Sequence, residues 1–453
     1  MPTGTRPCCG RAAARTRKER AMATKTIAIV GGGFAGATVA RCLERRLPDN
    51  WEIVLLSREN FITYNPLLPE VVGASLLPGH VIAPLRQLAT RSRVYAVQVT
   101  DIDLAERKVR YLGEGSGEIA FDELVLACGQ RANLALVKGM ARYALPLKTL
   151  GDSLFMRNRA IVRLEQAELQ PAAEQRRWLT SFVVIGGGFS GVEVAGGLAD
   201  FLRASKRYYK AIDDVRVQLV HSGDRLLPEL SPSLGRFAER RMREQGIDVR
   251  LNARCVRVDD RGITLADGEV MTAGTVTCTL GTAPNQLIAD LPLPKVRGRL
   301  EVAPDMSVPG APGVWALGDC AAVPNAHGGT ISPPTAQFAE RQARQLATNI
   351  VRKLCGRPTK PFSYRPLGQL SAIGHNKAVA EILGVKLAGF VAWLLWRGFY
   401  LLKIPTFGRK ARLFLEWNWA MFFPPDIAHL SYARTPRTAP KTDDQRDVPR
   451  AAA

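Results

Sequence analysis

Two glycine-rich turns carry the clearest chemistry in this sequence. Each follows a short run rich in β-branched residues, at 26–30 and 181–185, and each opens a helical segment. The pattern is GxGxxG, and its glycines are Gly31, Gly33 and Gly36 in the first copy and Gly186, Gly188 and Gly191 in the second. The first glycine makes the bend, the second lets the backbone approach a pyrophosphate, and the third lets helix and strand pack. Because the helix N-terminus also offers free N–H groups to phosphates, the two copies predict two bound dinucleotides and electron transfer between them.

The residues expected to hold the two ribose rings depart from the usual pattern. An acidic residue normally ends the second strand of such a unit and binds a ribose hydroxyl. Here Ser57 ends the first of these strands and His221 ends the second. Ser57, with Arg58 and Glu59 beside it, could still hold a ribose. His221 together with Arg225 could accept a 2′-phosphate, so the second cofactor stays open between NADH and NADPH.

The elements that must position these turns are two strand–turn–helix–strand units, completed by strands at 51–57 and 215–221. They predict an α/β fold with two Rossmann-like domains. Later in the chain a buried strand within 313–321 ends in Gly-Asp, and a helix is expected from about 334 to 354. A length of 453 residues suits two to three domains.

The charge of the chain is strongly basic, with a net charge of +21. Part of the excess lies in residues 1–21 and part in 382–415, where basic residues stand among Trp, Phe and Leu without any acid. This mixture suits an anionic membrane interface better than a nucleic-acid groove. The alternative is an ordinary solvent-exposed basic surface without a binding role. The apolar run 387–402 contains Arg397 and is shorter than the ~20 apolar residues of a membrane span, so we expect it to lie in the interface or to form a dimer or core contact.

The cysteines and the N-terminus bear on compartment. The eight cysteines show no CxxC or zinc-ligand spacing apart from the adjacent Cys8 and Cys9, so we expect reduced thiols and no metal site. The N-terminus lacks the apolar region of a secretory signal. It is Arg-rich and acid-poor, which weakly resembles a transit peptide, but Met22 as the true start is the simpler interpretation.

From residue 26 to residue 432 the chain resembles the type II NADH dehydrogenases, single-subunit NADH:quinone oxidoreductases of the two-dinucleotide-binding flavoprotein superfamily. Besides the glycine turns, the resemblance rests on the motifs NPLLPE (65–70), FDELVLACG (121–129), VTCTLGTAPN (276–285), LGD (317–319), AQFAERQ (336–342) and the ending 409–430 with FFPPDI. It implies FAD as the first cofactor and a nicotinamide dinucleotide as the second.

The resemblance also implies roles for residues around FAD. Asp319 matches the aspartate that binds the ribityl–phosphate part of FAD, and it is a short acceptor at a strand end. Pro66 lies in the segment similar to the one beside the flavin. Gly129 and Gly281 end the two linker strands near the cofactors.

Further implied roles concern the reacting groups. Gln337 and Arg341 lie four residues apart, share a helix face and fall in the quinone-side motif. Glu193, expected in the first turn of the second helix, matches a glutamate near nicotinamide and flavin, although an acid there is also favoured by the helix dipole alone. Lys377 lines the quinone pocket or is a surface lysine.

The expected domain division follows from these assignments. We expect an FAD-binding domain at 24–148 and 296–368, an inserted NAD(P)-binding domain at 149–295, and a C-terminal membrane-interface unit at 369–432. Residues 1–23 and 433–453 are expected to be disordered. The implied location is the cytoplasmic face of the inner (plasma) membrane, bound peripherally to anionic lipid, with a homodimer as an open possibility and no nucleic-acid partner.

The expected function is hydride transfer from NAD(P)H to FAD and two-electron transfer to a membrane quinone, without proton pumping. One alternative is a sulfide:quinone oxidoreductase-like flavoprotein, which needs two cysteines at the flavin. Cys128 and Cys355 are the candidates, neither in a convincing context. The other alternative is a membrane-associated nucleotide-binding flavoprotein without turnover, for which Ser57 and His221 argue.

Overall fold

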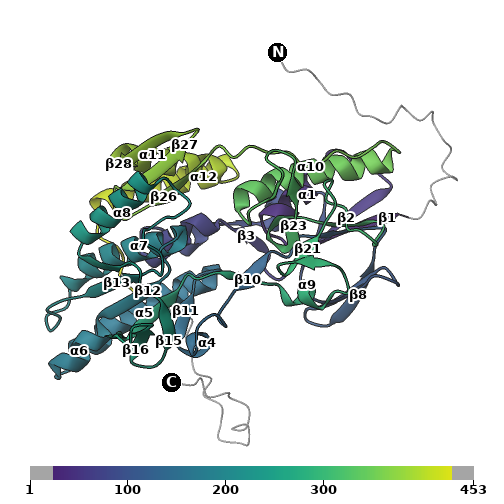
Figure 1. Ribbon diagram of the computed structural model, residues 1–453. Helices are drawn as coiled ribbons and strands as arrows, with labels where there is room; N and C mark the ends of the chain where they lie inside the picture. The colour runs from purple at the N-terminus through teal and green to yellow at the C-terminus, as the bar shows by residue number, and fades with distance from the viewer. Residues whose placement is uncertain (1–23, 431–453) are drawn as a thin grey trace, which may run out of the picture.

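The computed structural model describes residues 24–430. The segments expected to be disordered, 1–23 and 433–453, and the alternative start at Met22 lie outside the described residues. Two five-stranded parallel sheets form the centres of two units that lie side by side (Figure 1). The α/β architecture expected from the paired glycine turns is therefore confirmed.

The first sheet has the order β22-β9-β1-β2-β5. Its strands are β1 (Lys25–Val30), β2 (Trp51–Ser57), β5 (Arg93–Ala96), β9 (Glu123–Leu126) and β22 (Val314–Ala316). The helices α1 (Phe34–Leu43) and α10 (Ala336–Leu354) lie together on one face of it (Figure 1). A three-stranded antiparallel sheet of β6 (Gln98–Asp103), β7 (Lys108–Leu112) and β8 (Ser116–Ala120) flanks it. Because β22 pairs with β9, the chain returns to this sheet after the second unit.

The second sheet has the order β11-β18-β12-β13-β14. Its strands are β11 (Ala144–Pro146), β12 (Ser181–Ile185), β13 (Arg216–Val220), β14 (Ile247–Arg250) and β18 (Thr275–Cys278). The helices α5 (Leu150–Leu169), α7 (Phe189–Lys206) and α8 (Pro232–Glu244) belong to this unit. Since β11 already pairs with β18, the second unit's sheet begins a few residues before the division expected at 148/149.

The two units are joined by the short antiparallel pair β10 (Gln130–Ala132) and β19 (Thr282–Pro284). Each of these strands follows one of the linker glycines, Gly129 and Gly281, which have φ angles of +64° and +46°. Positive φ angles are accessible to glycine at little steric cost. The linkers therefore turn sharply beside the space between the units.

The C-terminal segment packs on both units. It contains β26 (Gly368–Ala372), β27 (Ala378–Ile382), β28 (Val385–Gly389), α11 (Phe390–Lys403) and α12 (Phe407–Phe422). Its Ile373 and Val379 are buried in the core of the second unit, and its Trp393 and Trp396 in the core of the first. The segment expected at 369–432 as a membrane-interface unit thus shares buried cores with both of its neighbours.

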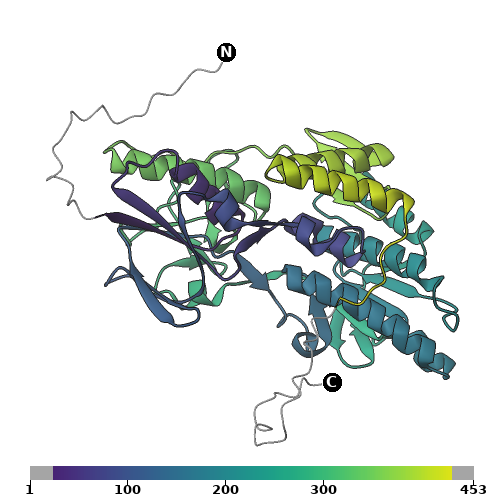
Figure 2. The ribbon, with the colours of Figure 1, turned by 180° about the vertical axis from the view of Figure 1, so that it is seen from behind.

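The end of the described chain is fastened to α5. After α12 it runs down across the back of the second unit (Figure 2). The buried guanidinium of Arg157 donates to the carbonyl oxygens of Asp426 (2.8 Å) and Ala428 (3.0 Å), and the Asn158 amide donates to Leu430 O (2.8 Å). These bonds tie the C-terminal helices to the second sheet's helix layer.

Candidate active site and cofactor cleft

One large cavity, of about 1490 Å³, extends from the first glycine turn to the start of the helix that follows the second. On the side of the first unit it is lined by Gly31, Gly32 and Gly33. On the side of the second unit it is lined by Phe189 and Ser190, which open α7 directly after the second turn. The first glycine turn and the start of α7 therefore share one cleft, as hydride transfer between two bound dinucleotides requires.

The first glycine turn has the geometry of a phosphate cradle. Gly31 has a φ of +112°, and a Cβ on Gly36 would overlap the carbonyl oxygen of Gly31, so only glycine allows this close helix–strand packing. A Cβ on Gly33, in contrast, would meet no atom within 4 Å. That open space faces the cavity at the N-terminus of α1, where backbone N–H groups bind anions well. The turn therefore fits a dinucleotide pyrophosphate.

The end of β2 offers polar groups beside this cradle. Ser57 is buried, and its hydroxyl lies against Gly32, within the cavity lining. Arg58 and Glu59 also line the cavity and form an exposed ion pair of 3.7 Å. A hydroxyl, a guanidinium and a carboxylate thus lie where the ribose and phosphates of a dinucleotide are expected.

Asp319 lies opposite the first turn, after β22. Burial raises the pKa of this carboxyl, while the charges of Lys148 and Arg299 oppose the shift. Gly318, with a φ of +72°, donates its backbone N–H to Gln342 Oε1 over 2.8 Å, so α10 fixes the turn. An acceptor in the cavity lining suits the hydroxyls of a ribityl chain, as expected for Asp319. Sequence reasoning missed Gln342, although it is the last residue of the quinone-side motif.

The second glycine turn repeats the geometry of the first. A Cβ on Gly191 would overlap the carbonyl oxygen of Gly186, whereas a Cβ on Gly188 would meet open space. Gly187 donates its backbone N–H to His221 Nδ1 over 3.2 Å. Burial lowers the pKa of His221, so the neutral imidazole carries its proton on Nε2 and can donate from there. The turn itself, apart from Phe189 and Ser190, lies outside the lining of the large cavity.

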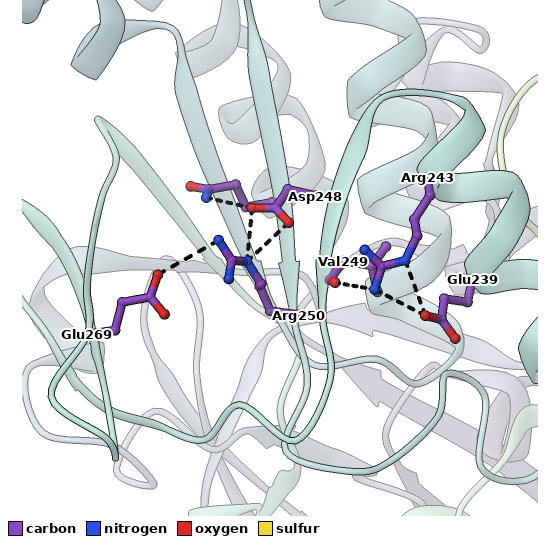
Figure 3. Close-up of polar contacts among 7 residues, drawn as sticks. Glu239, Arg243, Asp248, Val249, Arg250 and Glu269 are labelled. Carbon is purple, nitrogen blue, oxygen red and sulfur yellow. Dashed lines mark hydrogen bonds and ion pairs between the residues drawn. The ribbon is translucent and has the colours of Figure 1, made fainter.

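On β14, the strand beside His221, Arg250 already forms ion pairs with two carboxylates. His221 donates its backbone N–H to the carbonyl oxygen of Arg250. Figure 3 shows the Arg250 guanidinium between Asp248, at 3.1 Å, and Glu269, at 3.8 Å. Arg225 donates to Pro228 O over 3.1 Å. The ribose end of this site therefore contains a neutral imidazole and a nearby arginine, with no acid at the position where one is usual.

The quinone-side motif places one of its two expected residues in the cavity. Gln337, in the first turn of α10, lines it together with Glu340. Arg341 does not line it and instead lies over the ring of Tyr364, 5.3 Å from the ring centroid. The helix begins after Thr335, whose side chain accepts from Phe338 N, so Pro333 and Pro334 precede the cap.

Glu193 is buried, with 8% of its surface exposed, and it lines the cavity. The expectation that it lies in the first turn of its helix is wrong, because α7 begins at Phe189 and Glu193 is one turn further along. Its Oε1 accepts from the backbone N–H of Ala372 over 3.2 Å. Burial raises its pKa to about 8, with a contribution from the charge of Glu70. The carboxyl group is thus poised to exchange a proton near neutral pH.

The remaining candidates divide between the cavity and other places. Pro66, Gly129 and Gly281 line the cavity. Lys377 does not, and its backbone pairs with Ile373 in the turn between β26 and β27. Phe399, Tyr400 and Lys403 of α11 line the cavity without having been expected there. In residues 24–430 no three His, Cys, Asp or Glu side chains are grouped as a metal site would need.

Comparison with known proteins agrees with this geometry. Residues 25–343 match the family described as pyridine nucleotide-disulphide oxidoreductase. A type II NADH:quinone oxidoreductase of Mycobacterium tuberculosis is 32% identical over 417 residues, covering 86% of this chain and 87% of the relative. A demethylphylloquinone reductase of Synechocystis is 33% identical over 405 residues, covering 86% and 95%. The structure of NDH2 from Plasmodium falciparum in complex with NADH has a TM-score of 0.83 at 18% identity, covering 89% of this chain and 100% of that one.

The last likeness concerns the fold alone, whereas the first three concern the sequence as well. The family match covers more than half of the chain, and the bacterial relatives align over nearly their whole length. This chain belongs to the type II NADH:quinone oxidoreductases, within the pyridine nucleotide-disulphide oxidoreductase family.

Proposed function

We propose that this protein is an FAD-dependent enzyme that oxidises NADH, with NADPH as a further substrate, and reduces a membrane quinone without pumping protons. The observation that carries the proposal is the cleft that the first glycine turn shares with the start of α7, directly after the second turn's glycines. The names of the relatives from Mycobacterium and Synechocystis, a quinone oxidoreductase and a quinone reductase, support the same chemistry.

The chain's own residues would bind and orient the reactants. A bound FAD would supply the hydride-accepting and two-electron chemistry that links the nicotinamide to the quinone. The first turn and Asp319 hold FAD, and the second turn with His221 holds the nicotinamide dinucleotide. Gln337 donates a hydrogen bond to a quinone carbonyl from the first turn of α10. Glu193, protonated at neutral pH because of its raised pKa, supplies a proton to the same region.

We assign residues 24–148 and 296–368 to FAD binding and 149–295 to NAD(P) binding as an inserted domain. The pairing of β22 with β9 supports the insertion, because strands from both parts of the FAD domain complete one sheet. The pairing of β11 with β18 favours a boundary slightly before 144 for the second domain.

The C-terminal helices would attach the enzyme to a membrane. Apolar side chains are exposed along α11 and α12, namely Phe390, Val391, Leu394, Leu395, Leu402, Phe407, Phe414, Leu415, Trp419 and Phe422. Lys410 and Arg412 lie on the same elements, which suits anionic lipid. Within residues 24–430, every helix is too short or too polar to span a bilayer. This apolar and basic surface fits peripheral binding at the cytoplasmic face of a membrane. Alternatively, the same surface forms the interface of a homodimer.

The thiol chemistry of a sulfide:quinone oxidoreductase fits the site poorly. Cys128 lines the cavity, but burial raises the pKa of its thiol well above the ordinary value, which disfavours the reactive thiolate. Cys355 is exposed at the far end of α10 from Gln337. The two cysteines that this chemistry would require are therefore not brought together at the cleft.

The direct test is turnover by the purified full-length chain. We expect stoichiometric FAD and steady NADH oxidation that depends on an added quinone analogue such as decylubiquinone. Sulfide in place of NADH should give no reduction of the flavin. Tight NADH binding without turnover would support a nucleotide-binding flavoprotein instead. A purified chain that holds no flavin, and that takes up none when FAD is added, would contradict the proposal.

A further inference from the structure

The cofactor cavity reaches the C-terminal helices. There α11 contributes Phe399, Tyr400 and Lys403 to the lining. The same helix buries Ala392 and Trp396, while it exposes Phe390, Val391, Leu394, Leu395 and Leu402. This end of the cavity therefore lies directly beneath the surface that we assign to the membrane.

An ion pair stands at this end of the cavity. Lys403 Nζ, at the end of α11, lies 2.5 Å from Glu340 Oε2 on α10. Both side chains are partly buried, with 32% and 17% of their surface exposed, and both line the cavity. Glu340 follows Gln337 by three residues, so the two share one face of α10. The pair therefore places two opposite charges, one on α10 and one on α11, in the same part of the lining as Gln337.

The charge that this ion pair presents to the cavity depends on both partners being present. Together the two charges present no net charge to an apolar molecule. Removal of one partner leaves an uncompensated charge in a partly dry site, which costs far more than the pair itself contributes. Lys403 also lies 5.7 Å from the ring centroid of Phe399, so its ammonium group is held against an aromatic face as well.

We propose that Glu340 and Lys403 form the entrance through which a quinone reaches Gln337, and that their mutual neutralisation determines how readily a quinone with an apolar tail enters. This inference rests on the proposed function. The pair acts through access and positioning, so it should control the KM for the quinone and leave the NADH half-reaction untouched.

The test is a double-mutant cycle in the full-length holoenzyme. Glu340→Gln and Lys403→Met each leave one bare charge, and each should raise the KM for decylubiquinone roughly tenfold while kcat changes less than about twofold. The neutral double variant and the charge swap, Glu340→Lys with Lys403→Glu, should each return the KM to within about threefold of wild type. Menadione, which has no tail, should respond less. The rate of flavin bleaching by NADH should stay unchanged throughout.

A matched control is the exposed pair Lys108–Glu118, at 2.7 Å with 35% and 51% of the side chains exposed, in the antiparallel sheet. Lys108→Met should leave the quinone KM unchanged. The charge-preserving variants Glu340→Asp and Lys403→Arg guard against misfolding and should keep a near-normal KM. The inference is overturned if the single variants leave the KM unchanged, or if both double variants are as poor as the singles. Absence of quinone reduction by the wild type would instead overturn the proposed function itself.

Discussion

Ala372, at the end of β26, donates its backbone N–H to the buried carboxyl group of Glu193 over 3.2 Å. This bond joins the helix that follows the second glycine turn to the C-terminal segment. The group that we assign to proton supply is therefore held by the part of the chain that carries the apolar helices. The segment that we propose binds the membrane and the group that we propose supplies a proton are therefore directly connected.

The first prediction concerns Glu193 and the pH dependence of stability. Burial raises its pKa from 4.5 in the ordinary case to about 8 in the fold. Between these pH values the native state keeps a proton that the unfolded state has lost. The contribution of Glu193 to the free energy of unfolding is therefore fully present below pH 4.5 and is lost as pH rises through about 8. The contribution is at most about 1.4 kcal/mol per pH unit.

Thermal unfolding of wild type and Glu193→Gln from pH 5 to pH 8 measures this effect. The wild type should lose stability relative to the variant as pH rises, whereas Glu118→Gln, an exposed carboxylate, should follow the wild type. Parallel curves for wild type and Glu193→Gln would show that this carboxyl group does not titrate as the structure implies.

The second prediction concerns Gln342. Its Oε1 accepts from Gly318 N in a buried position, so Gln342→Leu leaves that N–H without a partner and should lower the free energy of unfolding by about 1–3 kcal/mol. Because the same turn carries Asp319, the variant should also retain less FAD. Denaturant unfolding and the flavin-to-protein ratio measure both effects. Gln345→Leu, on the same helix, should cost less, since the Asn349 oxygen keeps the N–H of Lys360 as a partner.

The third prediction separates two glycines of one turn. Gly36→Ala forces a Cβ into the carbonyl oxygen of Gly31 and should destabilise the fold by about 1–3 kcal/mol. Gly33→Ala meets open space, so the protein should fold normally but bind FAD weakly, because the methyl group takes the place of a phosphate. Thermal unfolding and flavin titration of the apoprotein distinguish the two. Normal FAD affinity in Gly33→Ala would refute the phosphate site.

The fourth prediction concerns the choice of nicotinamide. A carboxylate at position 221 would bind the ribose hydroxyls and repel a 2′-phosphate. His221→Glu should therefore raise the preference for NADH over NADPH by roughly tenfold or more, measured from the concentrations that half-saturate flavin reduction. His221→Gln, which stays neutral, should keep the wild-type ratio within about threefold. An unchanged ratio in the glutamate variant would place the 2′ group elsewhere.

Local signals in the sequence were sufficient for the two central units. The strands expected at 51–57 and 181–185 have those same limits in the structure. The strand 181–185 runs directly into the second glycine turn, so its end is marked in the sequence. The helix expected from about 334 begins at Ala336, because the side chain of Thr335 caps it.

Contacts between distant segments could not be predicted in the same way. Gln337 was expected at the site from its motif, but Lys403 reaches Glu340 only because the fold brings the C-terminal end of α11 to α10. Arg341 was expected beside Gln337 from helical spacing. Its guanidinium instead packs on the ring of Tyr364, in a loop after α10, and does not line the cavity. Periodicity gives the face of a helix, but not which neighbour covers each part of that face.

The most direct measurement is a double-mixing experiment under anaerobic conditions. The purified holoenzyme is mixed first with one equivalent of NADH and then with decylubiquinone, while absorbance near 450 nm is recorded. We expect rapid bleaching in the first step and full recovery in the second, with slowed bleaching in Gly188→Ala, whose added Cβ meets open space, and slowed recovery in Gln337→Ala. If NADH binds but leaves the absorbance unchanged, the two glycine turns do not serve one shared cleft.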